Sequence, residues 1–209
     1  VTSVQGISWQ EVSVIGQSNH AGTTPMSLRH DPAYVAAEIT VFLRKLAAEF
    51  GGDQVCTVGK IDLHPNLTNV VPAKATLTLD VRNTDESRLQ QAELRIANFL
   101  TEIAASEGVT ITTRKLARFE PVIFDDQVID TVESIAKQQG NSVQRMPSGA
   151  GHDAQMLARV CPSGMIFVPS VKGISHNPAE FTESIDLEAG ANILLHTMLA
   201  LTTLEKNTN

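Results

Sequence analysis

The sequence predicts an α/β protein in two parts: a ferredoxin-like βαββαβ domain over residues 1–117 and part of a further α/β domain over residues 118–209. Strand-like alternation and helical periodicity follow one another in that order through the first part. In the second part, helices alternate with only two strand-like segments. Because two strands and three helices cannot close a core of their own, we expect residues 118–209 to be the C-terminal portion of a larger domain.

The composition narrows the class of protein. Of the 209 residues, 42% are hydrophobic, which suffices for a packed core and argues against disorder. The net charge of -7 and the scattered lysines and arginines argue against a nucleic-acid partner, and the apolar runs are too short to cross a membrane. Cys56 and Cys161 form no disulfide framework, so we expect free thiols in a cytoplasmic setting. Both cysteines and the single Trp9 are assigned to the core.

The first half of the βαββαβ pattern is marked by clear helix boundaries. A strand is predicted over residues 7–16 and a loop over residues 17–30. Asp31 and Pro32 then predict a helix start, because an aspartate accepts from free backbone N–H groups and a proline suits the first turn. Apolar residues recur at helical spacing until Gly51-Gly52, which is expected to end the helix.

The second half repeats the pattern with two adjacent strands. Residues 54–64 are predicted as a strand, and residues 75–81 alternate strictly between apolar and polar side chains. A helix capped by Thr84 or Asp85 follows, and residues 109–118 form the last strand. One face of the predicted strand over residues 54–64 is expected to carry Val55, Thr57, Gly59, Ile61 and Leu63.

The C-terminal part is predicted to be mainly helical. Helices are expected over residues 127–139 and 186–204, and a short one over residues 153–158. Strands are expected near residues 142–145 and over residues 164–168, a continuous apolar run typical of a strand covered on both faces.

Three histidines lie in loops rich in small residues, where backbone and ligand can come close. His20 precedes Ala-Gly-Thr-Thr-Pro-Met and is placed to donate to an oxyanion or a carbonyl; the alternative is an exposed loop histidine. His152 lies at a predicted helix start, where free N–H groups favour an anionic ligand. In the alternative, Ser148 or Asp153 caps that helix and His152 is incidental.

His176 follows the predicted buried strand, and ligands of α/β layers gather beyond the C-terminal ends of strands. Its imidazole suits metal ligation, with Glu180 or Glu183 orienting the ring. The alternative is a loop histidine that is hydrogen-bonded to backbone.

Asn69 and Arg82 are further candidates. A guanidinium is a natural bidentate partner for a substrate carboxylate, but an ion pair of Arg82 with Asp80 or Asp85 is the default alternative. Asn69 stands before Val-Val-Pro, where it could simply turn the chain.

Five segments, in this order and over nearly the whole chain, resemble one family. They are His-Ala-Gly-Thr-Thr-Pro-Met at residues 20–26, Asn-Val-Val-Pro at 69–72, Asp-Val-Arg at 80–82, Ser-Gly-Ala-Gly-His-Asp-Ala at 148–154 and Ile-Ser-His-Asn-Pro-Ala-Glu at 174–180. Together they resemble the amidase/hydantoinase-carbamoylase branch of the M20 metallopeptidase family. That branch includes N-carbamoyl-L-amino-acid hydrolases, β-ureidopropionases and allantoate amidohydrolases.

The resemblance implies a role for each candidate. Residues 1–117 would be a lid that carries the dimer contact of a homodimer, and the catalytic domain would hold two divalent metal ions, zinc or manganese. His176 resembles the last metal ligand, and His152 resembles a substrate-binding residue. His20, Asn69 and Arg82 resemble the lid residues that grip the carboxylate and carbamoyl oxygen of a small ureido substrate, some of them in the active site of the partner subunit.

The implied reaction is metal-assisted hydrolysis of the carbamoyl C–N bond of N-carbamoyl-L-amino acids, which releases the amino acid, ammonia and carbon dioxide. His20 would stabilise the tetrahedral oxyanion. The alternatives are an allantoate amidohydrolase and a non-catalytic dimerisation or ligand-binding module. The family's other metal ligands and its general-base glutamate precede the lid and have no counterpart here. We therefore expect a piece of a longer polypeptide, beginning at Val1, that is inactive alone.

Overall fold

The computed structural model describes residues 1–204, and the chain divides into two compact units. The larger unit is Gln5–Pro121. The smaller unit combines Val1–Val4 with the chain from Val122 onward. The chain is a mixed α/β protein, as the sequence predicts.

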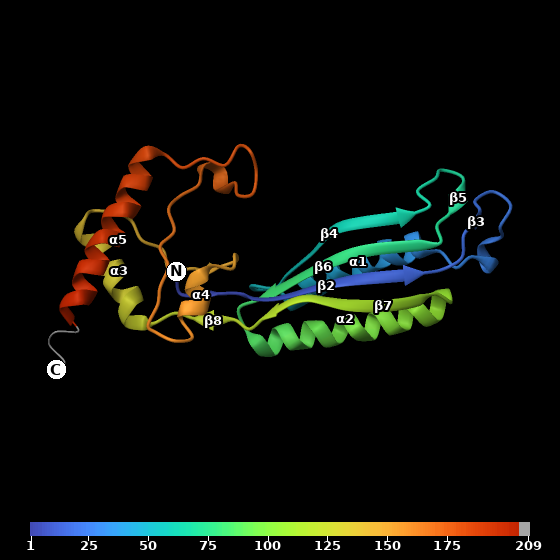
Figure 1. The fold of residues 1–209 in the computed structure, drawn as a ribbon, viewed down its shortest axis with the longest axis horizontal. Coiled ribbons are helices and arrows are strands. Elements are labelled where there is room, and N and C mark those ends of the chain that lie inside the picture. The colour runs from blue at the N-terminus through green and yellow to red at the C-terminus, as the bar shows by residue number, and fades with distance from the viewer. Residues whose placement is uncertain (205–209) are drawn as a thin grey trace. The chain divides into compact units, whose positions relative to one another are not determined.

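The larger unit is a four-stranded antiparallel sheet with two helices against it (Figure 1). The strand order across the sheet is β4-β6-β2-β7, so β6 and β2 lie at its centre. The elements are β2 (Gly6–Ile15), α1 (Pro32–Phe50), β4 (Val55–His64), β6 (Lys74–Asn83), α2 (Glu86–Glu107) and β7 (Thr110–Phe119).

Local capping sets the ends of both helices. Asp31 accepts a hydrogen bond from the Ala33 N–H at 2.9 Å, and α1 ends at Gly51 with a φ of 59°. Asp85, rather than Thr84, caps α2. The predicted helix boundaries are therefore confirmed.

The core of the larger unit lies between the sheet and the two helices. On β6, Ala75, Leu77, Leu79 and Val81 are buried, and the side chains between them are partly exposed, as predicted. Apolar side chains of α1 and α2 complete this core, and the rings of Phe42 and Phe99 stack with their centroids 4.0 Å apart. The opposite face of the sheet carries the polar residues of β6.

The predicted face of β4 is wrong at its start. Cys56 and Val58, not Val55 and Thr57, pack against the core, and Val55 is 47% exposed. The register with β6 shifts between Val58 and Lys60, and such a bulge exchanges the two faces of a strand. Beyond the bulge Leu63 packs against the core, on the predicted face.

The smaller unit is built on short elements. β1 (Ser3–Val4) pairs with β8 (Val122–Ile123) and β9 (Pro147–Ser148), and α5 (Ser184–Leu204) packs against α3 (Asp126–Gln138). One cluster of buried apolar residues consists of Val4, Phe124, Ile129 and Ala154. Several large apolar side chains of α5 are more than half exposed: Ile185, Leu187, Leu194, Leu195, Met198 and Leu199.

Two predicted strands of the smaller unit are wrong. Residues 142–145 and 164–168 adopt no regular secondary structure. A strand needs a neighbour that continues its hydrogen-bond ladder. Residues 164–168 receive a hydrogen bond from the Val1 ammonium to the Met165 carbonyl at 3.0 Å, but over the described residues they form no ladder with any strand.

Candidate functional site

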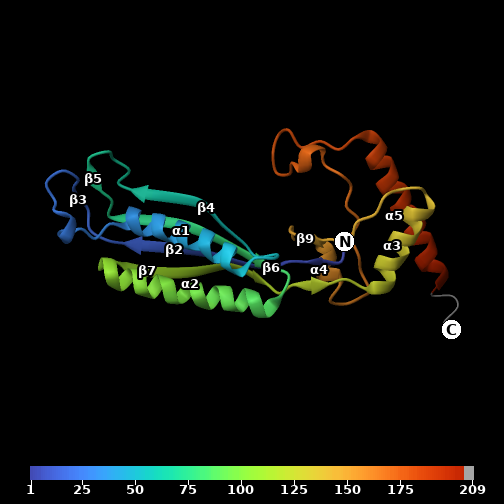
Figure 2. The same ribbon diagram turned by 180° about the vertical axis from the view of Figure 1, so that it is seen from behind.

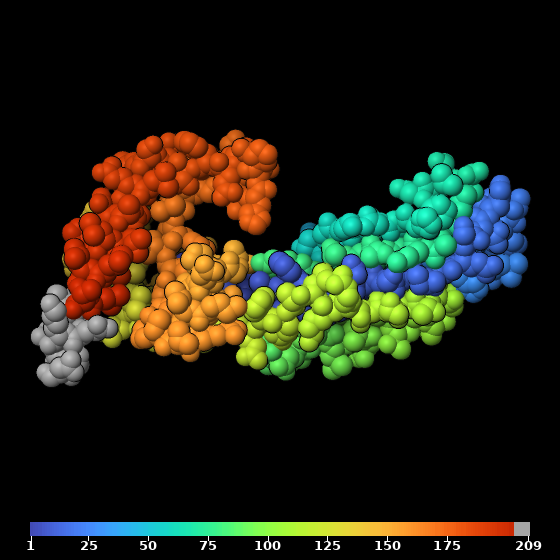
Figure 3. Space-filling model, viewed as in Figure 1, coloured from blue at the N-terminus to red at the C-terminus, as the bar shows by residue number. Residues whose placement is uncertain are grey.

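A small two-stranded sheet closes one end of the larger unit. β3 (Asn19–His20) pairs with β5 (Val70–Val71), and the Ala21 N–H donates to the Asn69 carbonyl at 2.9 Å. In both ribbon views this pair lies beyond the ends of β2 and β6 (Figures 1 and 2). The structure therefore brings His20 and Asn69 together from distant parts of the sequence, and both are exposed. In the space-filling view this end forms a protruding tip, coloured blue and teal (Figure 3).

The ring of His20 is held by its own loop. Its Nδ1 atom accepts hydrogen bonds from the backbone N–H groups of Gly22 at 3.0 Å and Thr23 at 3.1 Å. The Thr24 hydroxyl donates to the His20 carbonyl at 2.7 Å. His20 is thus an exposed loop histidine with a fixed ring.

Arg29 braces the same loop. Its Nη2 donates to the Ala21 carbonyl at 2.6 Å and its Nε to the Thr24 carbonyl at 3.1 Å. The sequence motifs did not point to Arg29. Arg29 is the one lysine or arginine of the predicted loop over residues 17–30. Backbone carbonyls in such a loop need partners other than those of a strand or helix, and a guanidinium can supply them.

Arg82 forms the ion pair that the sequence left as the default alternative. Its Nε and Nη2 donate to the two carboxylate oxygens of Asp80 at 2.8 and 2.6 Å, which raises the pKa of Arg82 above its usual value. The guanidinium also lies over the ring of Trp9, 5.8 Å from its centroid. The core assignment of Trp9 is wrong, because its side chain is 40% exposed.

Arg82 lies far from the tip. It pairs in register with Ile7 and Val55, at the opposite end of the sheet from the turn that precedes Lys74. At about 3.3 Å per residue, the strand from Lys74 to Arg82 spans roughly 26 Å. A single chain therefore does not bring Arg82 to His20 and Asn69.

His152 is itself the N-cap of α4 (Asp153–Leu157). Its Nδ1 accepts from the Ala154 N–H at 3.0 Å, whereas Ser148 hydrogen-bonds to Ala150. The interpretation in which Ser148 or Asp153 caps this helix is therefore wrong. The histidine is exposed, and one edge of its ring is committed to the helix start.

His176 lies in an exposed loop with left-handed backbone, at a φ of 56°. Its backbone N–H donates to Glu180 Oε2 at 2.8 Å, so Glu180 orients the main chain rather than the ring. Within residues 1–204, no three His, Cys, Asp or Glu side chains come close enough to form a metal site. The donors among the described residues therefore do not fit a metal pair, and the assignment of His176 as a ligand stays a prediction.

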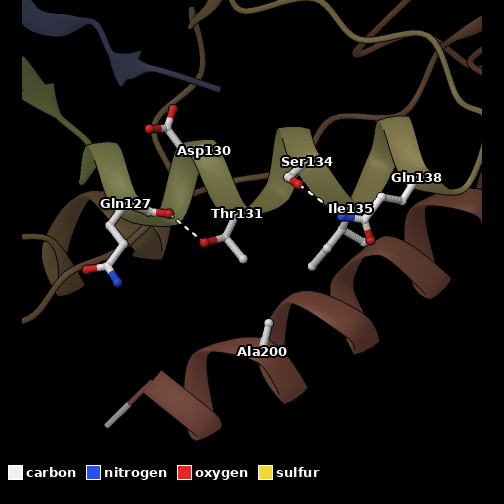
Figure 4. Close-up of a pocket in the computed structure, with 7 residues that line it drawn as sticks. All are labelled: Gln127, Asp130, Thr131, Ser134, Ile135, Gln138 and Ala200. Atoms are coloured by element: carbon white, nitrogen blue, oxygen red, sulfur yellow. Dashed lines mark hydrogen bonds between the residues drawn. The ribbon is translucent and has the colours of Figure 1, made fainter. Parts of the chain in front are cut away.

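A groove of about 680 Å³ runs between α3 and α5 (Figure 4). Two of its hydrogen bonds lie within α3: Thr131 donates to the Gln127 carbonyl at 2.7 Å and Gln138 to the Ser134 hydroxyl at 3.2 Å. Asp130, which also lines the groove, pairs with Arg145 at 2.5 Å. None of the five predicted site residues lines this groove.

The cysteines have different surroundings. Cys56 is partly buried against the core, which raises the pKa of its thiol to about 11. Cys161 is exposed, so its core assignment is wrong.

Over the described residues, no helix has the length and apolar character needed to cross a bilayer.

The larger unit carries the exposed tip with His20 and Asn69, and the smaller unit carries the exposed His152 and His176. These side chains define a protein with candidate groups for binding a polar small molecule. The family model of peptidase family M20/M25/M40 matches residues 19–200. The chain therefore belongs to this family.

Relatives and solved structures agree with this assignment. The chain is 38% identical to an N-carbamoyl-L-amino acid amidohydrolase of Geobacillus stearothermophilus, over 96% of this chain and 49% of that protein. It is 38% identical to an allantoate amidohydrolase of Escherichia coli, over 93% of this chain and 47% of that protein. A crystal structure of a hydantoinase/carbamoylase family amidase from Burkholderia multivorans superimposes with a TM-score of 0.90 at 37% identity, covering 95% of this chain and 48% of that one. The chain thus spans about half the length of the relatives it matches.

Proposed function

We propose that this chain is part of an M20 amidohydrolase that cleaves the carbamoyl C–N bond of N-carbamoyl-L-amino acids to the amino acid, ammonia and carbon dioxide. The observation that supports this most directly is the exposed tip at which His20 and Asn69 meet. Relatives named for carbamoyl and allantoate hydrolysis match the chain over more than nine-tenths of its length.

Each predicted site residue has a distinct role in this proposal. His20 donates a hydrogen bond to the carbamoyl oxygen as negative charge develops on it. The side-chain amide of Asn69 and the guanidinium of Arg82 hold the polar groups of the substrate, including its carboxylate. Binding at these remote groups orients the carbamoyl carbon for attack by water. His152 contacts the substrate from the smaller unit.

The separation of the site residues supports the proposal of a homodimer. A strand of about 26 Å separates Arg82 from the tip, and an N-carbamoyl amino acid is much shorter than that. We therefore propose that the larger units form the dimer contact, and that each site takes His20 and Asn69 from one chain and Arg82 from its partner. A two-fold axis would then generate two equal sites.

The family generally uses divalent metals. His176 is the one residue here that we assign to a metal, as a ligand in the longer protein. Removal of its imidazole should lower the metal content of the full-length enzyme, which elemental analysis of the His176→Ala variant measures.

The deciding experiment is a substrate panel on the full-length, metal-loaded enzyme. We expect ammonia release from N-carbamoyl-L-amino acids to exceed that from N-carbamoyl-β-alanine and allantoate. The His20→Ala variant should lose roughly 10²–10³-fold in kcat, as expected for a lost oxyanion donor. Because the allantoate amidohydrolase of Escherichia coli is as similar as the carbamoylase, allantoate is the second candidate substrate. No ammonia from any substrate would instead indicate a non-catalytic binding module.

A further inference from the structure

The hydrogen bonds of the His20 ring define its tautomer. Nδ1 receives two backbone N–H groups, from Gly22 at 3.0 Å and from Thr23 at 3.1 Å. A ring nitrogen that accepts a hydrogen bond carries no proton in the neutral imidazole, so the proton lies on Nε2. The exposed edge of the ring is therefore a donor, which is what an oxyanion requires.

This arrangement depends on the shape of the loop. The N–H groups of Gly22 and Thr23 point at one atom only while the chain from residue 21 to residue 24 keeps its turn. Arg29 donates to the carbonyls at both ends of that stretch, to Ala21 at 2.6 Å and to Thr24 at 3.1 Å. A planar guanidinium with donors in a fixed fork can hold two carbonyls at a set spacing, which a lysine cannot do.

The fit around the ring is close. A Cβ atom added at Gly22 would lie 3.3 Å from Cε1 and 3.5 Å from Nδ1 of His20. The glycine therefore lets the backbone approach the imidazole edge-on, and any larger residue would press on the ring. The loop thus contains the ring's partners and Arg29 holds those partners in place.

We propose that Arg29 is a positioning residue: it holds the His20 loop in the turn that places the ring proton on Nε2 and directs it outward to the substrate. This inference rests on the role of His20 proposed above. Arg29 itself contacts no substrate in this scheme, since its guanidinium donates to the loop carbonyls of Ala21 and Thr24.

Nitrogen chemical shifts of the histidine rings test the tautomer without any activity. Long-range ¹⁵N–¹H correlation spectra distinguish a ring nitrogen that carries a proton from one that only accepts, and the His20→Gln variant identifies the signals of His20. In the unsubstituted chain at neutral pH, we expect an unprotonated Nδ1 and a protonated Nε2. A protonated Nδ1 would overturn the inference and needs no Arg29 variant to be observed.

The Arg29→Gln variant tests the positioning. We expect the His20 nitrogen shifts to move toward the average of exchanging tautomers, while the Arg44→Gln variant, the same change on an exposed position of α1, leaves them unchanged. If Arg29 only stabilises the fold, Arg29→Gln will lower the unfolding midpoint and leave the His20 shifts as they were, and the proposal is then wrong.

Kinetics of the full-length enzyme separate this inference from the proposed function. Arg29→Gln should lower kcat about 10-fold and leave KM within about twofold, because a displaced donor costs transition-state stabilisation rather than substrate binding. Altered nitrogen shifts with an unchanged kcat would support the coupling of Arg29 to His20 and would contradict the catalytic role of His20.

Discussion

Asn69 and Arg82 flank the same strand, β6, at its two ends. Asn69 immediately precedes β5, the short strand before β6, and Arg82 is the last residue but one of β6. The strand between them keeps an unbroken alternation of buried and partly exposed residues, so the two side chains are held roughly 26 Å or more apart. Two groups at this separation serve one small substrate only if they come from different chains.

Mixed dimers test this directly. At substrate concentrations well below KM, full-length chains carrying His20→Ala and full-length chains carrying Arg82→Ala should each be nearly inactive. In a dimer of one chain of each kind, one site receives both defects and the other receives none. Random pairing should then restore about a quarter of the unsubstituted activity, and heterodimers purified by two different tags should have about half.

A matched pair of variants serves as the control for this experiment. His20 and Asn69 lie at one tip and are proposed to enter the same site from the same chain. Heterodimers of His20→Ala with Asn69→Ala chains should therefore carry one defect in each site and regain no activity. Equal restoration in both pairings would show that the sites are not shared as proposed.

The ion pair of Arg82 with Asp80 makes a prediction about substrate binding. If the guanidinium also binds the substrate carboxylate, Arg82→Ala should raise KM roughly 10- to 100-fold, the value of a charge-assisted hydrogen bond of about 1.5–3 kcal/mol. Arg114→Ala is the matched control, because Arg114 pairs with Glu11 on the same sheet and is 67% exposed. Steady-state kinetics with KM unchanged in Arg82→Ala would remove this residue from the site.

The helix ends were predictable from the sequence because their causes are local. The side chain of Asp31 and the positive φ of Gly51 act within one turn of the residues they cap. The face of β4 was not predictable, because the bulge beside Gly59 exists only against its neighbour β6. Residues 164–168 have the apolar character of a strand, but a strand also requires a partner along its edge, which no pattern within the segment reveals.

The candidate site was likewise predictable from the sequence only in part. The motifs around His20 and Asn69 singled out two residues that the β3–β5 pairing does bring together. The motif of Arg82 could not show its distance from them, since that depends on the register of β6 with β2. The bracing of the His20 loop by Arg29 depends on side-chain contacts to backbone carbonyls, and carbonyl directions are set by the fold.

The core of the larger unit supplies a stability prediction. Leu77 is fully buried between the sheet and the helices, and Leu94 is 62% exposed on α2. Leu77→Ala should lower the free energy of unfolding by about 2–5 kcal/mol through lost burial and the cavity left behind. Leu94→Ala, the same change on the surface, should stay within about 0.5 kcal/mol. Urea denaturation measures both, and equal effects would contradict the described core.

The two cysteines should differ in reactivity. The thiolate is the nucleophile toward iodoacetamide, and burial keeps the Cys56 thiol protonated by raising its pKa to about 11. At pH 8 the folded protein should therefore be alkylated at exposed Cys161 and react with Cys56 only slowly. Mass spectrometry of the digested protein reads the two sites separately, and urea-unfolded protein is the control in which both react. Comparable rates at the two sites in the folded state would contradict the burial of Cys56.

The same thiol should make stability fall at alkaline pH. In the unfolded chain Cys56 ionises near its usual pKa of 9.0, whereas in the folded protein it keeps its proton up to about pH 11. Between these values the folded state binds more protons than the unfolded state, so the free energy of unfolding decreases as the pH rises. Denaturant titrations at pH 8 and pH 10 should show a larger loss for the unsubstituted protein than for Cys56→Ala, which lacks the group. Cys161→Ala is the matched control, because it removes an exposed thiol rather than a buried one and should leave the loss unchanged. An equal loss in the unsubstituted protein and in Cys56→Ala would mean that the packing around β4 does not disfavour the thiolate.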